Sequence, residues 1–174
     1  MKLEKPLFIS VYPSIHGSII GLNSKGEICL NIRIPLLKGI RKADLHLLLA
    51  IISSLTMNNK NMFLCMEKQV LTLDNALIIE ANDGIALYNF LIAVCDSMEL
   101  DLKLVCFDDL KKEFTDDESL LGCDRVHIAK NLWPLDLASQ DPSAAKNNHR
   151  IFEGLVHALL PCEYFRRKFL KERN

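Results

Sequence analysis

The sequence predicts an α/β domain with a mixed five-stranded sheet flanked by helices. Two observations predict it. Three apolar segments joined by short links open the chain, and a helix-strand-helix-strand alternation follows them. At 174 residues, with 49% hydrophobic and 25% charged residues, the chain is long enough to bury a core without cross-links.

The first three segments are predicted to be strands of an antiparallel meander. Residues 7–11 read as a buried strand, and residues 16–22 read as a second one. Residues 27–34 alternate apolar and polar side chains, as a half-exposed strand does. The turn residues Asn23 to Gly26 join the last two segments, and such short links place neighbouring strands antiparallel.

The next part predicts parallel pairing. Apolar residues at helical spacing between Leu45 and Leu55 indicate a helix with Asp44 near its start. Residues 62–66 form a short buried strand that ends in Glu67. A helix over 83–98, for which Asp83 is read as the cap, precedes a fifth strand over 102–107. Strands separated by helices pair in parallel in most α/β folds.

The remainder is predicted to be helical. A helix over 125–133 ends at Pro134, and residues 135–147 have the composition of a loop. A helix over 148–160 ends at Pro161, because proline disrupts a helix interior. Residues 7–160 therefore form one domain, and residues 161–174 a basic C-terminal helix or tail.

Composition limits the function classes. The net charge of −1 favours a protein partner over DNA, since nucleic-acid binders usually carry a basic excess. The six cysteines form no CxxC pair, so we expect reduced core cysteines and a cytoplasmic protein rather than a zinc site. No apolar run reaches about 18 residues, so no membrane span or membrane partner is expected. The lone Trp133 is read as core packing.

Four segments together carry a recognisable order of motifs. They are residues 11–19, 63–68, 125–134 and 148–155. Pro13 and Gly17 fit an Asp-Pro-Gly-x-x-Gly-Ala pattern, and residues 148–155 fit Asp-His-x-x-x-Asp-Ala-Leu. The set resembles the motifs of RuvC-type Holliday junction resolvases. That resemblance implies a ribonuclease-H-like fold, a two-metal nuclease site and a homodimer.

The resemblance also implies which residues form the site. Glu67 and Glu153 stand at two of the four catalytic acidic positions, whereas Tyr12 and Asn148 stand where the family has aspartates. His149 could assist a metal-bound water. Hard divalent cations need oxygen ligands, most of them anionic. In a two-metal nuclease site the two cations lie about 3.5–4 Å apart. With two carboxylates lost, we expect Mg²⁺ or Mn²⁺ binding at Glu67 and Glu153 to be weak or absent.

Three functions remain open. The first is a resolvase homologue that has lost nuclease activity and acts by binding a protein partner or branched DNA. The second is an active metal-dependent junction endonuclease with a rearranged carboxylate site. The third is an interaction domain unrelated to nucleic acid. A basic segment near the end of the sequence is the candidate for nucleic-acid or partner contacts: Arg166, Arg167, Lys168 and Lys171.

Overall fold

The five-stranded sheet is the centre of the computed structural model, which describes residues 6–68, 79–115, 125–134 and 146–173. The strands are β1 (Leu7–Val11), β2 (Ser18–Asn23), β3 (Ile28–Arg33), β4 (Met62–Glu67) and β5 (Leu102–Val105). Their order is β3-β2-β1-β4-β5. The first three strands pair antiparallel, and β4 lies parallel to both β1 and β5. The predicted mixed five-stranded sheet is therefore confirmed.

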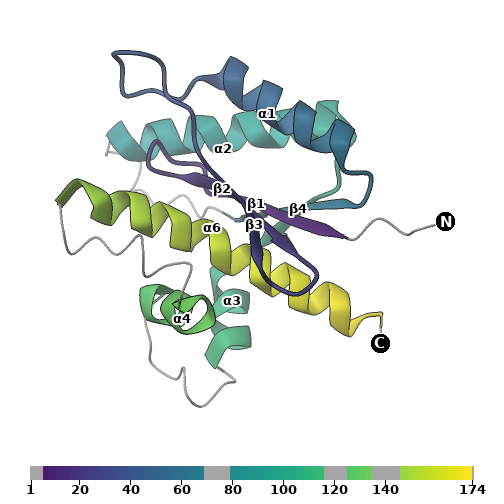
Figure 1. Cartoon of the computed structure of the whole chain (residues 1–174). Coiled ribbons are helices and arrows are strands. Elements are labelled where there is room, and N and C mark those ends of the chain that lie inside the picture. Colours follow the sequence, from purple (N-terminus) through teal and green to yellow (C-terminus); the bar gives the residue numbers. More distant parts are fainter. Residues whose placement is uncertain (1–5, 69–78, 116–124, 135–145, 174) are drawn as a thin grey trace.

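Helices cover both faces of the sheet (Figure 1). The helices are α1 (Leu45–Asn58), α2 (Ile79–Ser97), α3 (Phe107–Thr115), α4 (Arg125–Leu132) and α6 (Lys146–Lys171). Helices α1 and α2 lie on one face, and α6 with α3 and α4 lies on the other. None of the helices in the described ranges combines the length and the apolar composition needed to cross a bilayer.

Side-chain alternation along β1 supplies both halves of the core. Ile9 and Val11 point to the α1–α2 face, where they pack with Leu48 of α1 and Leu91 of α2. Phe8, on the opposite face, stacks on Phe63 of β4 with ring centroids 5.5 Å apart. Burying one such aliphatic or aromatic side chain contributes about 1.5–3 kcal/mol to folding, so a strand with core on both faces anchors the domain.

Helix α1 begins as the sequence predicts. Asp44 is its N-cap, and its carboxylate accepts a hydrogen bond of 3.0 Å from the backbone N–H of Leu47. The same interpretation is wrong for Asp83, which lies inside α2 rather than at its start. The fifth strand is shorter than expected, because Phe107 already begins α3, a helix that the sequence reading did not include.

Helix α6 contradicts the prediction that a helix ends at Pro161. It continues through this proline to Lys171, so the basic residues belong to the same helix as Glu153. Pro161 is buried, and its carbonyl oxygen accepts a hydrogen bond from the Cys65 thiol of β4. Packing of α6 along β1, β2 and β4 thus overrides the local preference of proline.

The cysteine expectation holds in part. Cys65, Cys95 and Cys162 are buried free thiols, whereas Cys29 and Cys106 are exposed. Cys123 lies outside the described residues.

Candidate functional site

The candidate site lies where β1 and β4 end. In the parallel register Ser10 is opposite Cys65, so the chain positions two residues further on, Tyr12 and Glu67, lie side by side at the sheet edge. Carboxyl ends of parallel strands commonly carry the functional groups of α/β folds. Tyr12 follows β1 directly, and Glu67 is the last residue of β4.

Helix α6 adds residues from the face opposite α1 and α2. The imidazole of His157 stacks on the Tyr12 ring, with centroids 4.5 Å apart and planes 18° from parallel. Glu153 lies one turn earlier on the same side of the helix, and its negative charge adds to the effects of burial and of Glu67, which raise the pKa of Tyr12. The structure therefore brings Tyr12, Glu67 and Glu153 together.

The other two predicted site residues belong to the first turn of α6. Asn148 and His149 lie within the helix, but their side chains fall outside the described part of the structure. Their roles therefore stay predictions from the resemblance.

Two glycines shape the contact between α6 and the loop after β1. A Cβ placed on Gly154 would lie 1.9 Å from the carbonyl oxygen of His16, and one on Gly17 would lie 1.9 Å from the carbonyl oxygen of Tyr12. A larger residue at Gly154 would push the loop and the helix apart, and one at Gly17 would distort the loop itself. The close contact holds Glu153 and His157 against the end of β1.

A guanidinium group donates hydrogen bonds to both carboxylate oxygens of Glu67. Arg125, the first residue of α4, donates from Nη1 to Oε2 at 2.5 Å and from Nη2 to Oε1 at 2.9 Å. The Arg125 and Glu67 side chains are only 22% and 16% exposed. Arg125 also lies over the ring of Phe107, at 4.0 Å from its centroid. A paired geometry of this kind is among the stronger ion pairs in proteins.

His157 completes the cluster around this ion pair. Its Nδ1 lies 2.7 Å from Nη1 of Arg125 and 3.8 Å from Oε2 of Glu67. Because a guanidinium can only donate, Nδ1 of His157 accepts this hydrogen bond and the ring hydrogen is assigned to Nε2. The imidazole is therefore held from three sides, by Tyr12, Arg125 and Glu67.

The pKa values of the site follow from these contacts. Burial raises the pKa of Glu67, but its polar contacts with His157 and Arg125 and the charge of Arg125 outweigh this effect, so the pKa lies below 4.5. Burial, and then the negative charge of Glu67, raise the pKa of Tyr12 above 10.0. At neutral pH the site thus holds an ionised carboxylate paired with an arginine, beside an uncharged phenol.

These residues do not fit a two-metal centre. Both oxygens of Glu67 already accept hydrogen bonds from a cation that would repel a nearby dication. Within the described ranges, no three or more His, Cys, Asp or Glu side chains are grouped as metal ligands would be.

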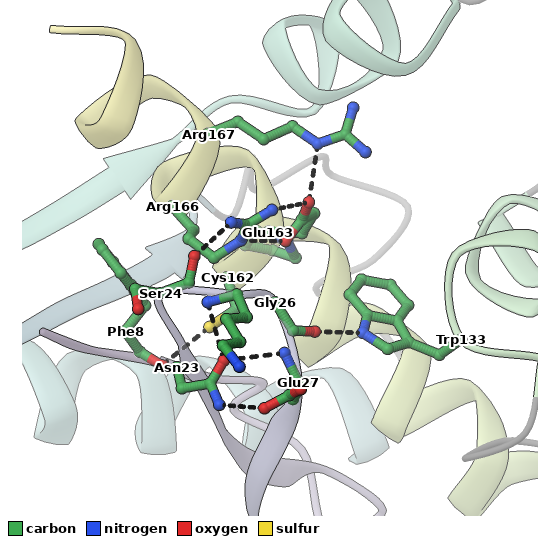
Figure 2. Close-up of polar contacts among 12 residues, drawn as sticks. Phe8, Asn23, Ser24, Gly26, Glu27, Trp133, Cys162, Glu163, Arg166 and Arg167 are labelled. Carbon is green, nitrogen blue, oxygen red and sulfur yellow. Dashed lines mark hydrogen bonds and ion pairs between the residues drawn. The ribbon is translucent and has the colours of Figure 1, made fainter. Parts of the chain in front are cut away.

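Two of the predicted basic residues, Arg166 and Arg167, bind the carboxylate of Glu163 (Figure 2). The guanidinium of Arg166 donates two hydrogen bonds of 2.7 Å to the buried Glu163 and one of 2.8 Å to the backbone carbonyl of Ser24. Arg167 donates to the same Glu163 at 2.7 Å. Arg166 thus ties α6 to the β2–β3 turn, whereas Arg167 pairs with Glu163 within the helix.

The remaining members of the basic set are also engaged. Lys171 pairs with Glu113 of α3 at 2.8 Å, and Lys168 lies 4.8 Å from the centroid of the Tyr164 ring. Trp133 is 5% exposed, and its indole N–H donates to the carbonyl of Gly26 at 2.9 Å (Figure 2). The core-packing interpretation of this tryptophan is confirmed.

Sequence reasoning did not select two residues of the site, Arg125 and His157. His157 follows Glu153 by four residues, so helical spacing already places both on one face. Arg125 gives no comparable signal, because 58 residues separate it from Glu67 and only the fold brings them together.

Comparison with known proteins supports the fold. No protein-family model and no curated protein sequence matches the chain. Two similar solved structures are one of Thermus thermophilus RuvC and one of T. thermophilus RuvC in complex with a Holliday junction substrate. Each matches with a TM-score of 0.53 and 9% identity, over 95% of this chain and 97% of the other. The chain therefore has the ribonuclease-H-like α/β fold of these RuvC structures.

Proposed function

We propose that the chain is a ribonuclease-H-like protein that binds branched DNA without hydrolysing it. The observation that carries the proposal is the ion pair between Arg125 and Glu67, which puts a guanidinium where the resemblance implies a metal. The ligand class comes from the fold, because a RuvC structure that matches over nearly the whole chain is a complex with a Holliday junction substrate.

Loss of hydrolysis follows from the charge of the site. A two-metal mechanism needs dications at the attacking and leaving oxygens, held by several anionic ligands. Here the charge of Glu67 is neutralised by Arg125, and Tyr12 offers an uncharged phenol that is fixed by stacking on His157. The described site residues offer two carboxylates, Glu67 and Glu153, and with Glu67 neutralised they supply too little charge for two dications.

A cleavage and binding assay tests this function directly. The chain is incubated with a labelled four-way junction and a matched duplex, with Mg²⁺ or Mn²⁺ and with a chelator. We expect the chain to bind the junction and to yield no cleavage product with either metal. Metal-dependent cleavage by the unaltered chain that disappears in Glu67→Gln would overturn the proposal, and so would failure to bind either DNA.

A set of repaired variants tests the role of Arg125. Tyr12→Asp with Asn148→Asp restores the carboxylates that the resemblance implies, and Arg125→Ala frees Glu67. We expect Mn²⁺ to raise the melting temperature of the triple variant but not that of the double variant, because a metal centre acts as a unit. Equal metal stabilisation of both variants would show that Arg125 does not block the site.

A further inference from the structure

The segment that joins β3 to α1 forms an ordered projection. In this β3–α1 loop, residues 35–43, Leu36 and Ala43 form an isolated antiparallel bridge. Within it the N–H of Leu37 donates to the carbonyl of Lys42 at 2.9 Å, and that of Ile40 donates to the carbonyl of Leu37 at 3.2 Å. Gly39 at the turn has φ 79° and open space around its Cβ position. The loop extends from the end of the molecule where α6 begins (Figure 1).

This loop lies in a basic segment of a chain whose total charge is −1. Residues 28–43 contain four cations and no Asp or Glu. All four are exposed: Arg33 at the end of β3, and Lys38, Arg41 and Lys42 in the loop. Among the described residues none of them has an ion-pair partner, unlike the arginines of α6, which bind Glu163. The loop cations are therefore available to an anionic ligand.

The loop lies on the same edge of the sheet as the candidate site. Strands β1, β3 and β4 run in the same direction, so the loop after β3 emerges beside Tyr12 and Glu67. The N–H of Ile34, at the base of the loop, donates to the carbonyl of Gly17 at 3.0 Å. With strands about 4.8 Å apart, the ends of β3 and β4 are separated by roughly 15 Å. One DNA arm laid on this edge can reach both.

Aliphatic side chains stand among these cations. Leu36, Leu37 and Ile40 are 44%, 41% and 56% exposed. Exposed aliphatics beside lysine and arginine suit a ligand that has both phosphates and unstacked bases, because apolar side chains can wedge between base steps. A branched DNA offers such bases where its arms meet.

We propose that the β3–α1 loop is a DNA-contacting element, with its cations on phosphates of one arm and Leu37 and Ile40 against bases at the branch point. The proposal rests on the proposed function, since it takes branched DNA as the ligand. An acidic protein surface or an anionic membrane would meet the same charges, but the shared edge with the candidate site favours the DNA that this site would face.

The test compares two lysine pairs of equal charge. Lys38→Ala with Lys42→Ala removes two loop cations, and Lys25→Ala with Lys60→Ala removes two exposed lysines at the opposite edge of the sheet. Junction Kd is measured by fluorescence anisotropy between 50 and 200 mM salt. We expect the loop pair to weaken binding by roughly tenfold and to reduce the salt slope by about 2, and the control pair to change neither.

A second variant separates base contacts from charge. Leu37→Ser with Ile40→Ser should reduce the preference for junction over duplex and leave the salt slope unchanged. All variants should keep the melting temperature of the parent, because the altered side chains are exposed.

Each outcome has a distinct meaning. Equal effects of the loop and control pairs, or no effect of either, would overturn the loop assignment while leaving DNA binding in place. Loop-dependent binding to phosphatidylserine vesicles with unchanged junction binding would also overturn it. Cleavage of the junction by the parent chain refutes the proposed function alone, and absence of any DNA binding refutes both.

Discussion

Replacement of Arg125 by methionine should destabilise the protein substantially. Glu67 is 16% exposed, so without the guanidinium its ionised carboxylate stays in a poorly solvated place with no cation paired to it and with His157 3.8 Å away. Removing one partner of a buried pair costs about 3–5 kcal/mol, and the partial exposure of this pair reduces that to about 2–3 kcal/mol. For a chain of this size, the melting temperature should fall by roughly 4–12 °C.

A double-mutant cycle measures the interaction itself. The variants are Arg125→Met, Glu67→Met and the two together, each unfolded by urea at neutral pH. The double variant should be more stable than either single one, because a pair of apolar side chains leaves no uncompensated charge. We expect a coupling free energy of about 1.5 kcal/mol or more.

An exposed ion pair provides the control for this cycle. Lys103 and Asp101 lie 2.8 Å apart, but their side chains are 51% and 76% exposed. Lys103→Met should therefore change the free energy of unfolding by less than about 0.5 kcal/mol. If Arg125→Met is as mild as this control, and the cycle gives no coupling, Arg125 does not neutralise Glu67 and the reasoning about the site is refuted.

Three further predictions concern pH, packing and thiols. The pKa of Glu67 in the folded protein is below 4.5, so its contribution to stability is complete above that pH and is lost as the pH falls through the folded value. Urea titrations should therefore show that the parent has a higher free energy of unfolding than Glu67→Gln at neutral pH and that this difference disappears in acid. Gly154→Ala should destabilise the protein by about 1–3 kcal/mol because its Cβ would clash with His16. Gly84→Ala is the control and should be far milder, because its Cβ would lie 3.2 Å from the carbonyl oxygen of Pro13. Equal losses of stability in calorimetry would contradict this prediction. Iodoacetamide should label the exposed thiols of the native protein, Cys29 and Cys106, before the buried ones, as measured by mass spectrometry. Rapid labelling of Cys65 or Cys162 would be inconsistent with the packing of α6.

The sheet was predictable because its signals are local. Alternation in β3, the apolar run of β1 and the cap at Asp44 each depend on a few neighbouring residues. Helix α3 carries a similar signal in Leu110 and Phe114, both buried and four residues apart, but many charged side chains surround them and no helix was predicted there.

The parts that sequence did not reveal depend on contacts between distant residues. Proline disfavours a helix interior, which predicts that the helix ends at Pro161, yet packing against β4 stabilises α6 beyond this residue. The basic residues of α6 suggested a binding patch, and only the position of the buried Glu163 shows that Arg166 and Arg167 form ion pairs within the helix. For the candidate site, motif order predicted Tyr12, Glu67 and Glu153, whereas the contact of Arg125 with Glu67 is visible only in the fold.

The attachment of α6 to the opening meander also sets a waiting time during synthesis. Cys162 donates to the carbonyl of Phe8, and Arg166 donates to that of Ser24, across 154 and 142 residues. At about 5–20 residues per second, a ribosome needs roughly 7–30 s to add the residues between such partners. Throughout that interval the apolar face formed by Phe8, Ile20 and Leu22 lacks the helix that covers it. A nascent chain stalled before residue 146 should therefore bind holdase chaperones, and release should follow emergence of the final helix.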